Sequence, residues 1–260
     1  MTQAFAKSAD GTQIAYQVEG NGPPLLLLPG QANNHHWWDG VRDDFAHVRT
    51  TITLDYRGIG DSDKPDAPYS IELFARDALA VLDELGIKSA DLYGTSMGGR
   101  TAQILAARRP DRVRKLILGC TSPGGEHGLE RNDAVRRSLA QIDRAAARQA
   151  LAELMYTPSW LTEHPGPHQT MGDPDMPDHA RRQHLRASAA HDAWDLLPDI
   201  HSQTLVLHGT EDVFNPAANA PLLAERIPDA RLHMIEGARH AYFEEFRDVA
   251  GPLVLDFLTS

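Results

Sequence analysis

Cysteine is nearly absent from this chain of 260 residues, which contains Cys120 alone. A single thiol cannot form an intramolecular disulfide, so the sequence shows no adaptation to an oxidising compartment. Cys120 ends an apolar run that begins at residue 113, and we interpret it as a small buried residue. The chain therefore carries neither a disulfide framework nor an evident cysteine nucleophile.

Long apolar segments and an excess of basic residues are also missing. The first twelve residues lack the basic flank and the apolar stretch of a signal peptide, and the apolar block 25–28 is too short to cross a bilayer. Asp and Glu outnumber Lys and Arg by 36 to 25, and the net charge of -11 argues against a nucleic-acid-binding surface. We therefore expect a cytoplasmic protein that has no membrane or nucleic-acid partner.

What the sequence does contain is the composition of a globular domain, with 42% apolar and 23% charged residues. Short β-rich segments alternate with longer amphipathic segments, a pattern typical of βαβ units and a mainly parallel sheet. The predicted strands are residues 12–19, 24–28, 51–55, 90–93, 115–119, 204–208 and 231–235. The turn-forming segment 20–23 is expected to join the first two of them in an antiparallel edge hairpin.

Apolar residues at helical spacing predict helices at 70–85, 97–109 and 216–226. For the first of these, Ser70 is the predicted N-cap and Gly86 the stop.

The alternation of strands and helices breaks between residues 122 and 201. Strands vanish there, and Ala- and Arg-rich helical segments (132–155 and 179–194) flank a Pro- and Gly-rich stretch at 158–177. We interpret residues 122–201 as a helical cap inserted into an α/β core that is formed by residues 1–121 and 202–260.

The pentapeptide Gly-Thr-Ser-Met-Gly at residues 94–98 lies directly between a predicted strand and a predicted helix. A serine hydroxyl is a weak nucleophile at neutral pH, so an enzyme must expose its oxygen, supply a base and stabilise the oxyanion. A tight strand-to-helix turn lifts the Ser96 oxygen above the sheet. It also places the Met97 N–H at a helix N-terminus, where developing negative charge is favoured. The N–H of Gln31, which follows the flexible Gly30, is the predicted second oxyanion donor.

An acid and a base follow the serine in the expected order. Asp212 and His240 each come just past the carboxyl end of a predicted strand, at the sheet edge where catalytic groups collect. We predict that His240 takes the proton of Ser96 and returns it to the leaving group, while Asp212 orients the imidazole. Two alternatives are that Glu211 is the acid or that Asp212 only caps a turn.

Taken together, these residues resemble the α/β-hydrolase superfamily over nearly the whole chain except the cap. Residues 28–30 (Leu-Pro-Gly) are similar to its oxyanion loop, with Pro29 in place of the usual His, and residues 55–62 match the segment after its fourth strand. Ser-Met-Gly-Gly is most similar to the motif of 3-oxoadipate enol-lactonases, cofactor-free haloperoxidases and C–C-bond hydrolases. The resemblance implies an α/β-hydrolase fold, in which an eight-stranded, mostly parallel sheet is flanked by helices and carries a helical cap. It implies no cofactor.

Since Ser96 and not an acidic residue occupies the turn, acyl chemistry is favoured over that of epoxide hydrolases or haloalkane dehalogenases. We expect a serine hydrolase that cleaves a small ester or lactone through an acyl-enzyme. The alternatives are a C–C-bond hydrolase, a biosynthetic acyltransferase or cyclase, and a ligand-binding protein that retains the triad without turnover.

Further side chains are candidates for substrate contact. Asn33 and Trp37 follow the oxyanion loop and Trp160 offers an aromatic surface in the cap, so we predict that all three bind substrate. Core packing is the alternative for the tryptophans. Arg57 and Arg100 are interpreted as structural. The cap histidines lack the spacing of a ligand set, so no metal site is predicted.

Overall fold

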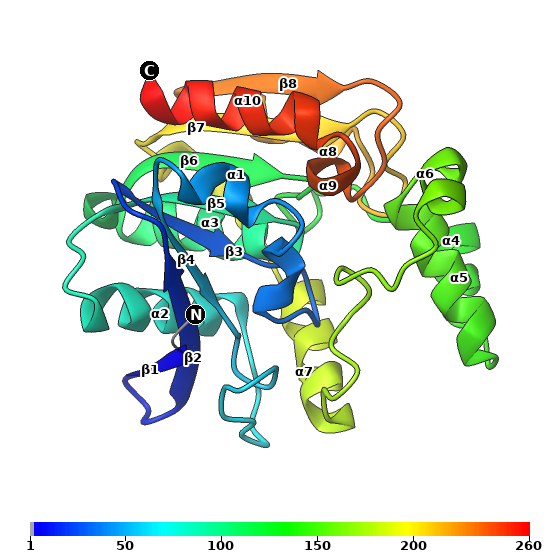
Figure 1. Cartoon of the computed structure of the whole chain (residues 1–260), viewed down its shortest axis with the longest axis horizontal. Coiled ribbons are helices and arrows are strands. Elements are labelled where there is room, and N and C mark those ends of the chain that lie inside the picture. The colour runs from blue at the N-terminus through cyan, green and yellow to red at the C-terminus, as the bar shows by residue number, and fades with distance from the viewer. Residues whose placement is uncertain (1–2) are drawn as a thin grey trace.

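The computed structural model describes residues 3–260, and its central feature is a sheet of eight strands (Figure 1). Met1 and Thr2, which open the predicted core segment, lie outside the described residues. The strands are β1 (Gln3–Lys7), β2 (Gln13–Glu19), β3 (Pro24–Leu28), β4 (Thr50–Leu54), β5 (Ala90–Thr95), β6 (Val113–Gly119), β7 (Gln203–Gly209) and β8 (Ala230–Ile235). Their spatial order is β1-β2-β4-β3-β5-β6-β7-β8, and all pairs from β4 to β8 are parallel. The predicted α/β fold with a mostly parallel sheet is confirmed.

The antiparallel hairpin at the edge of the sheet joins different strands from those predicted. β2 forms its hairpin with β1, and its other edge pairs antiparallel with β4. The predicted hairpin between residues 12–19 and 24–28 is therefore wrong, because β3 lies between β4 and β5. The four leucines of β3 are fully buried, so this strand needs cover on both faces, which a central place in a parallel sheet provides. β1 was not predicted, because three of its five residues are exposed and it lacks an apolar run.

Alternate side chains of the buried strands project to opposite faces of the sheet, and different helices cover each face. Leu25 and Leu27 of β3 belong to one apolar cluster, together with residues of α1 and α10. Leu26 and Leu28 belong to the other, together with residues of α2, α3 and α8. These helices are α1 (Arg42–Ala46), α2 (Ile71–Glu84), α3 (Met97–Arg108), α8 (Asn219–Arg226) and α10 (Arg247–Thr259). The sheet is thus the middle layer of three.

The helices predicted in the core correspond to α2, α3 and α8. The Ser70 hydroxyl caps α2 by accepting a hydrogen bond from the Leu73 N–H at 3.1 Å, as predicted. Gly86, just past the end of α2, has a φ of +66°, a conformation that glycine adopts without strain. The shorter helices η1 (His35–Trp38), η2 (Pro110–Arg112) and α9 (Tyr242–Glu245) lie in connections between these elements.

Between β6 and β7 the chain is mainly helical, and we call residues 122–201 the cap. Its helices are α4 (Asp133–Leu139), α5 (Arg144–Met155), α6 (Pro158–Glu163), α7 (Asp178–Ala189) and η3 (Trp194–Asp199). Figure 1 shows α4, α5 and α6 beyond the carboxyl ends of the strands, where the arrowheads point. α6 lies at the start of the stretch described from sequence as Pro- and Gly-rich. Its Pro158 does not prevent a helix, because it occupies the first helical position, where proline is tolerated. No helix within residues 3–260 combines the length and apolarity that a membrane span requires.

One histidine of the cap is expected to make stability depend on pH. His184 of α7 is fully buried, and its Nε2 lies 2.9 Å from the carbonyl oxygen of Arg57 in the core. Burial lowers the pKa of His184 to about 4, and the hydrogen bond to Arg57 offsets this only in part. Below its ordinary pKa of 6.5 the unfolded chain therefore binds a proton that the folded chain does not. His184 alone should therefore lower the free energy of unfolding by about 3 kcal/mol as the pH drops from 6.5 to 4.

Urea unfolding at pH 6.5 and pH 4.5 checks this expectation. The wild type should lose more stability between the two pH values than His184→Gln, which has no imidazole to protonate. His201→Gln removes an exposed histidine and serves as the matched control. Its free energy of unfolding should depend on pH as that of the wild type does. An identical loss in all three proteins would show that His184 is not the cause.

Candidate active site

Ser96 occupies a strained turn between β5 and α3. Its φ of 55° and ψ of -121° lie in a region that residues with side chains rarely adopt. Surrounding hydrogen bonds hold this conformation, since the Ser96 N–H donates to the Gly119 carbonyl at 2.9 Å and the Thr121 hydroxyl donates to the Ser96 carbonyl at 2.7 Å. Strain of this kind is concentrated at functional positions.

Close packing around this turn requires glycine at positions 94 and 98. A Cβ atom on Gly94 would lie 2.3 Å from the Gly98 carbonyl oxygen, and one on Gly98 would lie 2.0 Å from the Leu28 carbonyl oxygen. Side chains at these positions would push α3 away from β3 and β5. The glycines therefore allow the N-terminus of α3 to lie against the loop that follows β3.

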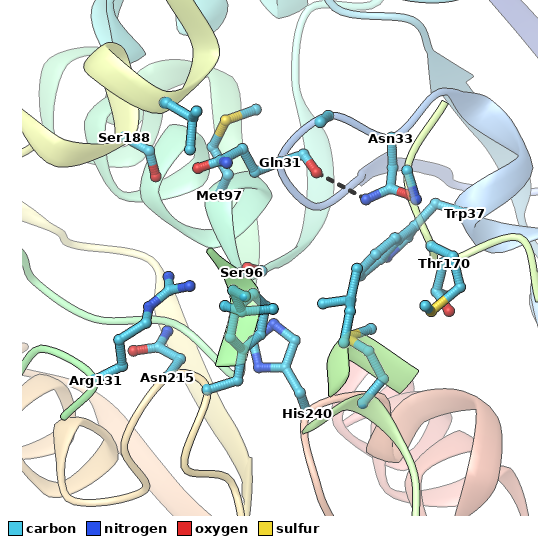
Figure 2. Close-up of a pocket in the computed structure, with 18 of the residues that line it drawn as sticks. Gln31, Asn33, Trp37, Ser96, Met97, Arg131, Thr170, Ser188, Asn215 and His240 are labelled. Carbon is cyan, nitrogen blue, oxygen red and sulfur yellow. Dashed lines mark hydrogen bonds between the residues drawn. The ribbon is translucent and has the colours of Figure 1, made fainter. Parts of the chain in front are cut away.

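The two predicted oxyanion donors, Met97 and Gln31, line the same cavity as Ser96 (Figure 2). Met97 is the first residue of α3, so its N–H has no acceptor within the helix. Gln31 lies in the loop after β3. The following residue, Ala32, has a φ of 59°, and its carbonyl accepts a hydrogen bond from the Asp173 N–H of the cap at 2.7 Å. The oxyanion loop is thus anchored to the cap.

Asn33 reinforces this anchoring. Its side chain is buried, its Nδ2 donates to the Gln31 carbonyl at 2.8 Å, and its Oδ1 accepts from the Gly172 N–H at 2.8 Å. Asn33 lines the cavity, but these contacts already engage the amide that was predicted to bind substrate.

The two tryptophans predicted to bind substrate lie in different places. Trp37 lines the cavity, with its indole N–H donating to the Thr95 hydroxyl at 2.9 Å. Trp160 is not among the residues that line the cavity. Its ring stacks on His164 instead, with 3.8 Å between the ring centroids, so the structure does not bring Trp160 to the site.

Asp212 and His240 are hydrogen-bonded to each other. His240 Nδ1 lies 2.7 Å from Asp212 Oδ2, and both side chains are buried. His240 lines the same cavity as Ser96 (Figure 2), and its Nε2 is buried without a hydrogen-bond partner among residues 3–260. A nitrogen in that condition is available to accept a proton from a group in the cavity. The rival acid, Glu211, has a side chain that is 57% exposed and pairs with Arg239.

Two further groups hold the Asp212 carboxylate, and neither was identified from sequence. The Asn215 N–H donates to Asp212 Oδ1 at 2.8 Å, and His208 Nε2 lies 3.2 Å from Oδ2. Burial alone raises the pKa of Asp212, but the charges and hydrogen bonds of His240 and His208 outweigh it and hold the pKa well below its usual range. The carboxylate is therefore ionised when it contacts His240. The position of His208 at the end of β7 was the available signal, because its side chain shares the edge occupied by Asp212.

Comparison with known proteins agrees with this geometry. Residues 23–246 match the family described as alpha/beta hydrolase fold. The chain belongs to the α/β-hydrolase family. It is 34% identical to 2-hydroxymuconate semialdehyde hydrolase of Pseudomonas sp. (strain CF600), over 96% of this chain and 92% of that protein.

Solved structures of hydrolases superpose on nearly the whole of this α/β hydrolase. The esterase EaEST from Exiguobacterium antarcticum matches with a TM-score of 0.88 and 27% identity over 100% of both chains. The enol-lactonase from Burkholderia xenovorans LB400 matches with a TM-score of 0.87 and 26% identity over 99% of this chain and 100% of that one. The superfamily resemblance found in the sequence is confirmed, and the protein is a hydrolytic enzyme.

The cavity of this hydrolase has a volume of about 320 Å³ and lies between core and cap. Ser96, His240 and the oxyanion loop contribute its polar core-side wall. The cap contributes apolar side chains, namely Leu139, Leu151, Met155, Met171 and Leu185. Such a site suits a small substrate with an apolar portion.

The two arginines that were interpreted as structural differ in their surroundings. Arg57 forms ion pairs with Asp77 at 2.6 Å and with Asp10 at 2.7 Å, and it does not line the cavity. Arg100 of α3 bonds to Ser122 and Ser188, as a structural residue would, but it also lines the cavity. Within residues 3–260, no group of three or more His, Cys, Asp or Glu side chains is placed to hold a metal ion.

Proposed function

We propose that this α/β hydrolase cleaves small carboxylic esters or lactones through an acyl-enzyme formed on Ser96. The observation that carries the proposal is the hydrogen bond of 2.7 Å between His240 Nδ1 and Asp212 Oδ2, which leaves Nε2 without a partner in the cavity that Ser96 lines. A histidine that is oriented by an acid and shares a cavity with a serine is what a serine, base and acid triad requires, which supports the proposal.

In the proposed first step His240 Nε2 accepts the hydroxyl proton of Ser96 as the oxygen attacks the substrate carbonyl carbon. The backbone N–H groups of Met97 and Gln31 stabilise the resulting oxyanion, and each such donor is worth about 3 kcal/mol in the transition state. The ionised Asp212 stabilises the imidazolium. The tetrahedral intermediate then expels the alcohol, which takes its proton from His240, and the acyl group remains on Ser96.

In the proposed second step a water molecule attacks the acyl-enzyme, and His240 accepts its proton. The second intermediate breaks down to the free acid, and the proton on His240 returns to the Ser96 oxygen. A lactone follows the same route, except that its alcohol stays tethered to the acyl group until hydrolysis.

A C–C-bond hydrolase is the second candidate, because two relatives at 34% and 32% identity bear the name 2-hydroxymuconate semialdehyde hydrolase. The same Ser96 and His240 would act on a ketone or aldehyde carbon in place of an ester carbon. Turnover of 2-hydroxymuconate semialdehyde at a kcat/KM well above that for every ester and lactone would favour this candidate.

A substrate panel combined with active-site labelling tests the proposal. The panel comprises p-nitrophenyl esters of increasing acyl length and a set of lactones, and the label is a fluorophosphonate. We expect turnover of short esters or lactones and labelling that is lost in Ser96→Ala but kept in Ser159→Ala, which alters an exposed serine of α6. Labelling of Ser96 without hydrolysis of any ester or lactone would count against ester hydrolysis and favour C–C cleavage or acyl transfer.

A further inference from the structure

The cavity beside Ser96 is cationic, although the chain as a whole has a net charge of -11. Three arginines line it, Arg100, Arg131 and Arg181, whereas no Asp, Glu or Lys is among the residues that line it. A cavity that concentrates positive charge in an acidic protein attracts anions and disfavours cations.

Arg131 is the least satisfied of these arginines. It lies in the segment between β6 and α4, is half-buried, and its guanidinium carbon stands 4.2 Å from the centre of the Phe214 ring. Within residues 3–260 its guanidinium has neither a hydrogen-bond acceptor nor a carboxylate within 4.0 Å. Burial lowers the pKa of the Arg131 guanidinium, and the charges of Glu130 and Asp212 offset this only in part, so an anion in the cavity would stabilise the charge further.

The position of Arg131 points to the substrate. The Phe214 ring that it covers makes an edge contact with the imidazole of His240, with 4.8 Å between the ring centroids. Figure 2 shows Arg131 beside Asn215, on the opposite side of Ser96 from Trp37. A substrate whose carbonyl sits at Ser96 therefore reaches a cation on one side and an aromatic surface on the other.

Arg100 adds a second positive charge to the cavity, near enough to Arg131 for the two charges to repel each other. Among residues 3–260 its guanidinium bonds to neutral groups alone, the carbonyl oxygen and hydroxyl of Ser188 and the hydroxyl of Ser122. Burial lowers the pKa of Arg100, the charge of Glu130 opposes this, and the charge of Arg131 adds to it, so that the pKa is about 10. Two partly desolvated guanidiniums that repel each other are both stabilised when an anion binds beside them.

We propose that Arg131, supported by the charge of Arg100, binds a carboxylate of the substrate. The enzyme then acts on small esters or lactones that carry a free carboxylate in addition to the carbonyl that reacts, an assignment that rests on the proposed function. Guanidinium groups bind carboxylates through paired, charge-assisted hydrogen bonds, which gives both affinity and orientation. The apolar remainder of the substrate packs against Trp37 and the methionines of the cap.

Matched substrate pairs test this assignment. Monoethyl glutarate and ethyl pentanoate differ by a carboxylate in place of a methyl group on the acyl side, and 4-acetoxybenzoate and 4-methylphenyl acetate differ in the same way on the alcohol side. In at least one pair the wild type should show a kcat/KM for the anionic ester that exceeds that for the neutral one by about tenfold or more. Anionic-to-neutral ratios at or below one in both pairs would overturn the assignment.

Variants of Arg131 connect the preference to this residue. Arg131→Gln should lower the anionic-to-neutral ratio by about tenfold or more, mainly through a higher KM, and Arg131→Lys should retain part of it. Arg137→Gln makes the same charge change at an exposed position of α4 and should leave the ratio unaltered. A ratio that is unchanged in Arg131→Gln, or that falls equally in Arg137→Gln, contradicts the assignment.

A binding measurement separates this inference from the proposed function and does not depend on turnover. Glutarate should bind to Ser96→Ala in a calorimeter, and the affinity should fall by about tenfold or more in Ser96→Ala/Arg131→Gln. If the wild type hydrolyses no ester, the proposed function fails while binding that requires Arg131 still supports the anion site. If the wild type hydrolyses neutral esters but glutarate binds neither Ser96→Ala nor Ser96→Ala/Arg131→Gln, the proposed anion site is contradicted while the proposed function stands. Urea unfolding of each variant verifies that the fold is retained.

Discussion

Ser96→Ala is expected to lower kcat for a small ester on the order of 10⁶-fold, the scale seen when a serine hydrolase loses its nucleophile. The substitution removes only the hydroxyl oxygen. The Cβ atom is kept, so the strained backbone at φ 55° carries the same Cβ as in the native protein. The variant should therefore fold and bind substrate while it lacks the oxygen that forms the acyl-enzyme. Steady-state kinetics at matched protein concentration measure the loss, after labelling has excluded contamination by wild type.

The control for this substitution is Ser159→Ala, at an exposed position of the cap outside the cavity. It should keep kcat within about twofold of the wild type, because surface substitutions of this kind change little. A kcat for Ser96→Ala within tenfold of the wild type would mean that another group attacks the substrate.

Asp212→Asn is expected to lower kcat by about 10⁴-fold. The carboxylate now accepts the hydrogen of His240 Nδ1 at 2.7 Å, which leaves Nε2 unprotonated and able to act as a base. An amide that donates a hydrogen bond to Nδ1 would favour the opposite tautomer, with the proton on Nε2. The Asn215 N–H still finds a side-chain oxygen at position 212, so the loop after β7 should keep its conformation.

Glu211→Gln is the matched control, because it makes the same chemical change one residue away. The Glu211 side chain is 57% exposed and faces Arg239, so its loss should alter kcat by less than about twofold. The kinetic comparison also decides between the two acids left open by the sequence. A large loss in Glu211→Gln together with a small loss in Asp212→Asn would reverse the assignment.

The sequence was most informative where structure and chemistry are local. Ser96, Asp212 and His240 were each predicted as catalytic candidates from the strand that precedes them, because the carboxyl ends of parallel strands meet at one edge of the sheet. Gly94 also marked the turn locally, since a Cβ atom there would meet the backbone of Gly98, whereas the contact of Gly98 with Leu28 joins distant segments.

Features that depend on contacts between distant segments were not predictable in this way. The partner of β2 is set by the central burial of β3, which the local turn at 20–23 does not reveal. The cap segment that folds over Ser96 brings in Arg131 from beyond β6, whereas Trp160 turns away to stack on His164. Helical spacing in the cap predicts helices, but it does not determine which of their side chains reach the cavity.

The most direct test of the central claim is a search for the acyl group on Ser96 itself. The enzyme is mixed with p-nitrophenyl butanoate, quenched in acid within the first turnovers, and analysed by intact and tandem mass spectrometry. We predict a species heavier than the free enzyme by one butanoyl group, with the added mass on the peptide that contains Ser96 and absent from Ser96→Ala. Hydrolysis that proceeds with no such adduct, or with the adduct on another residue, would contradict the account.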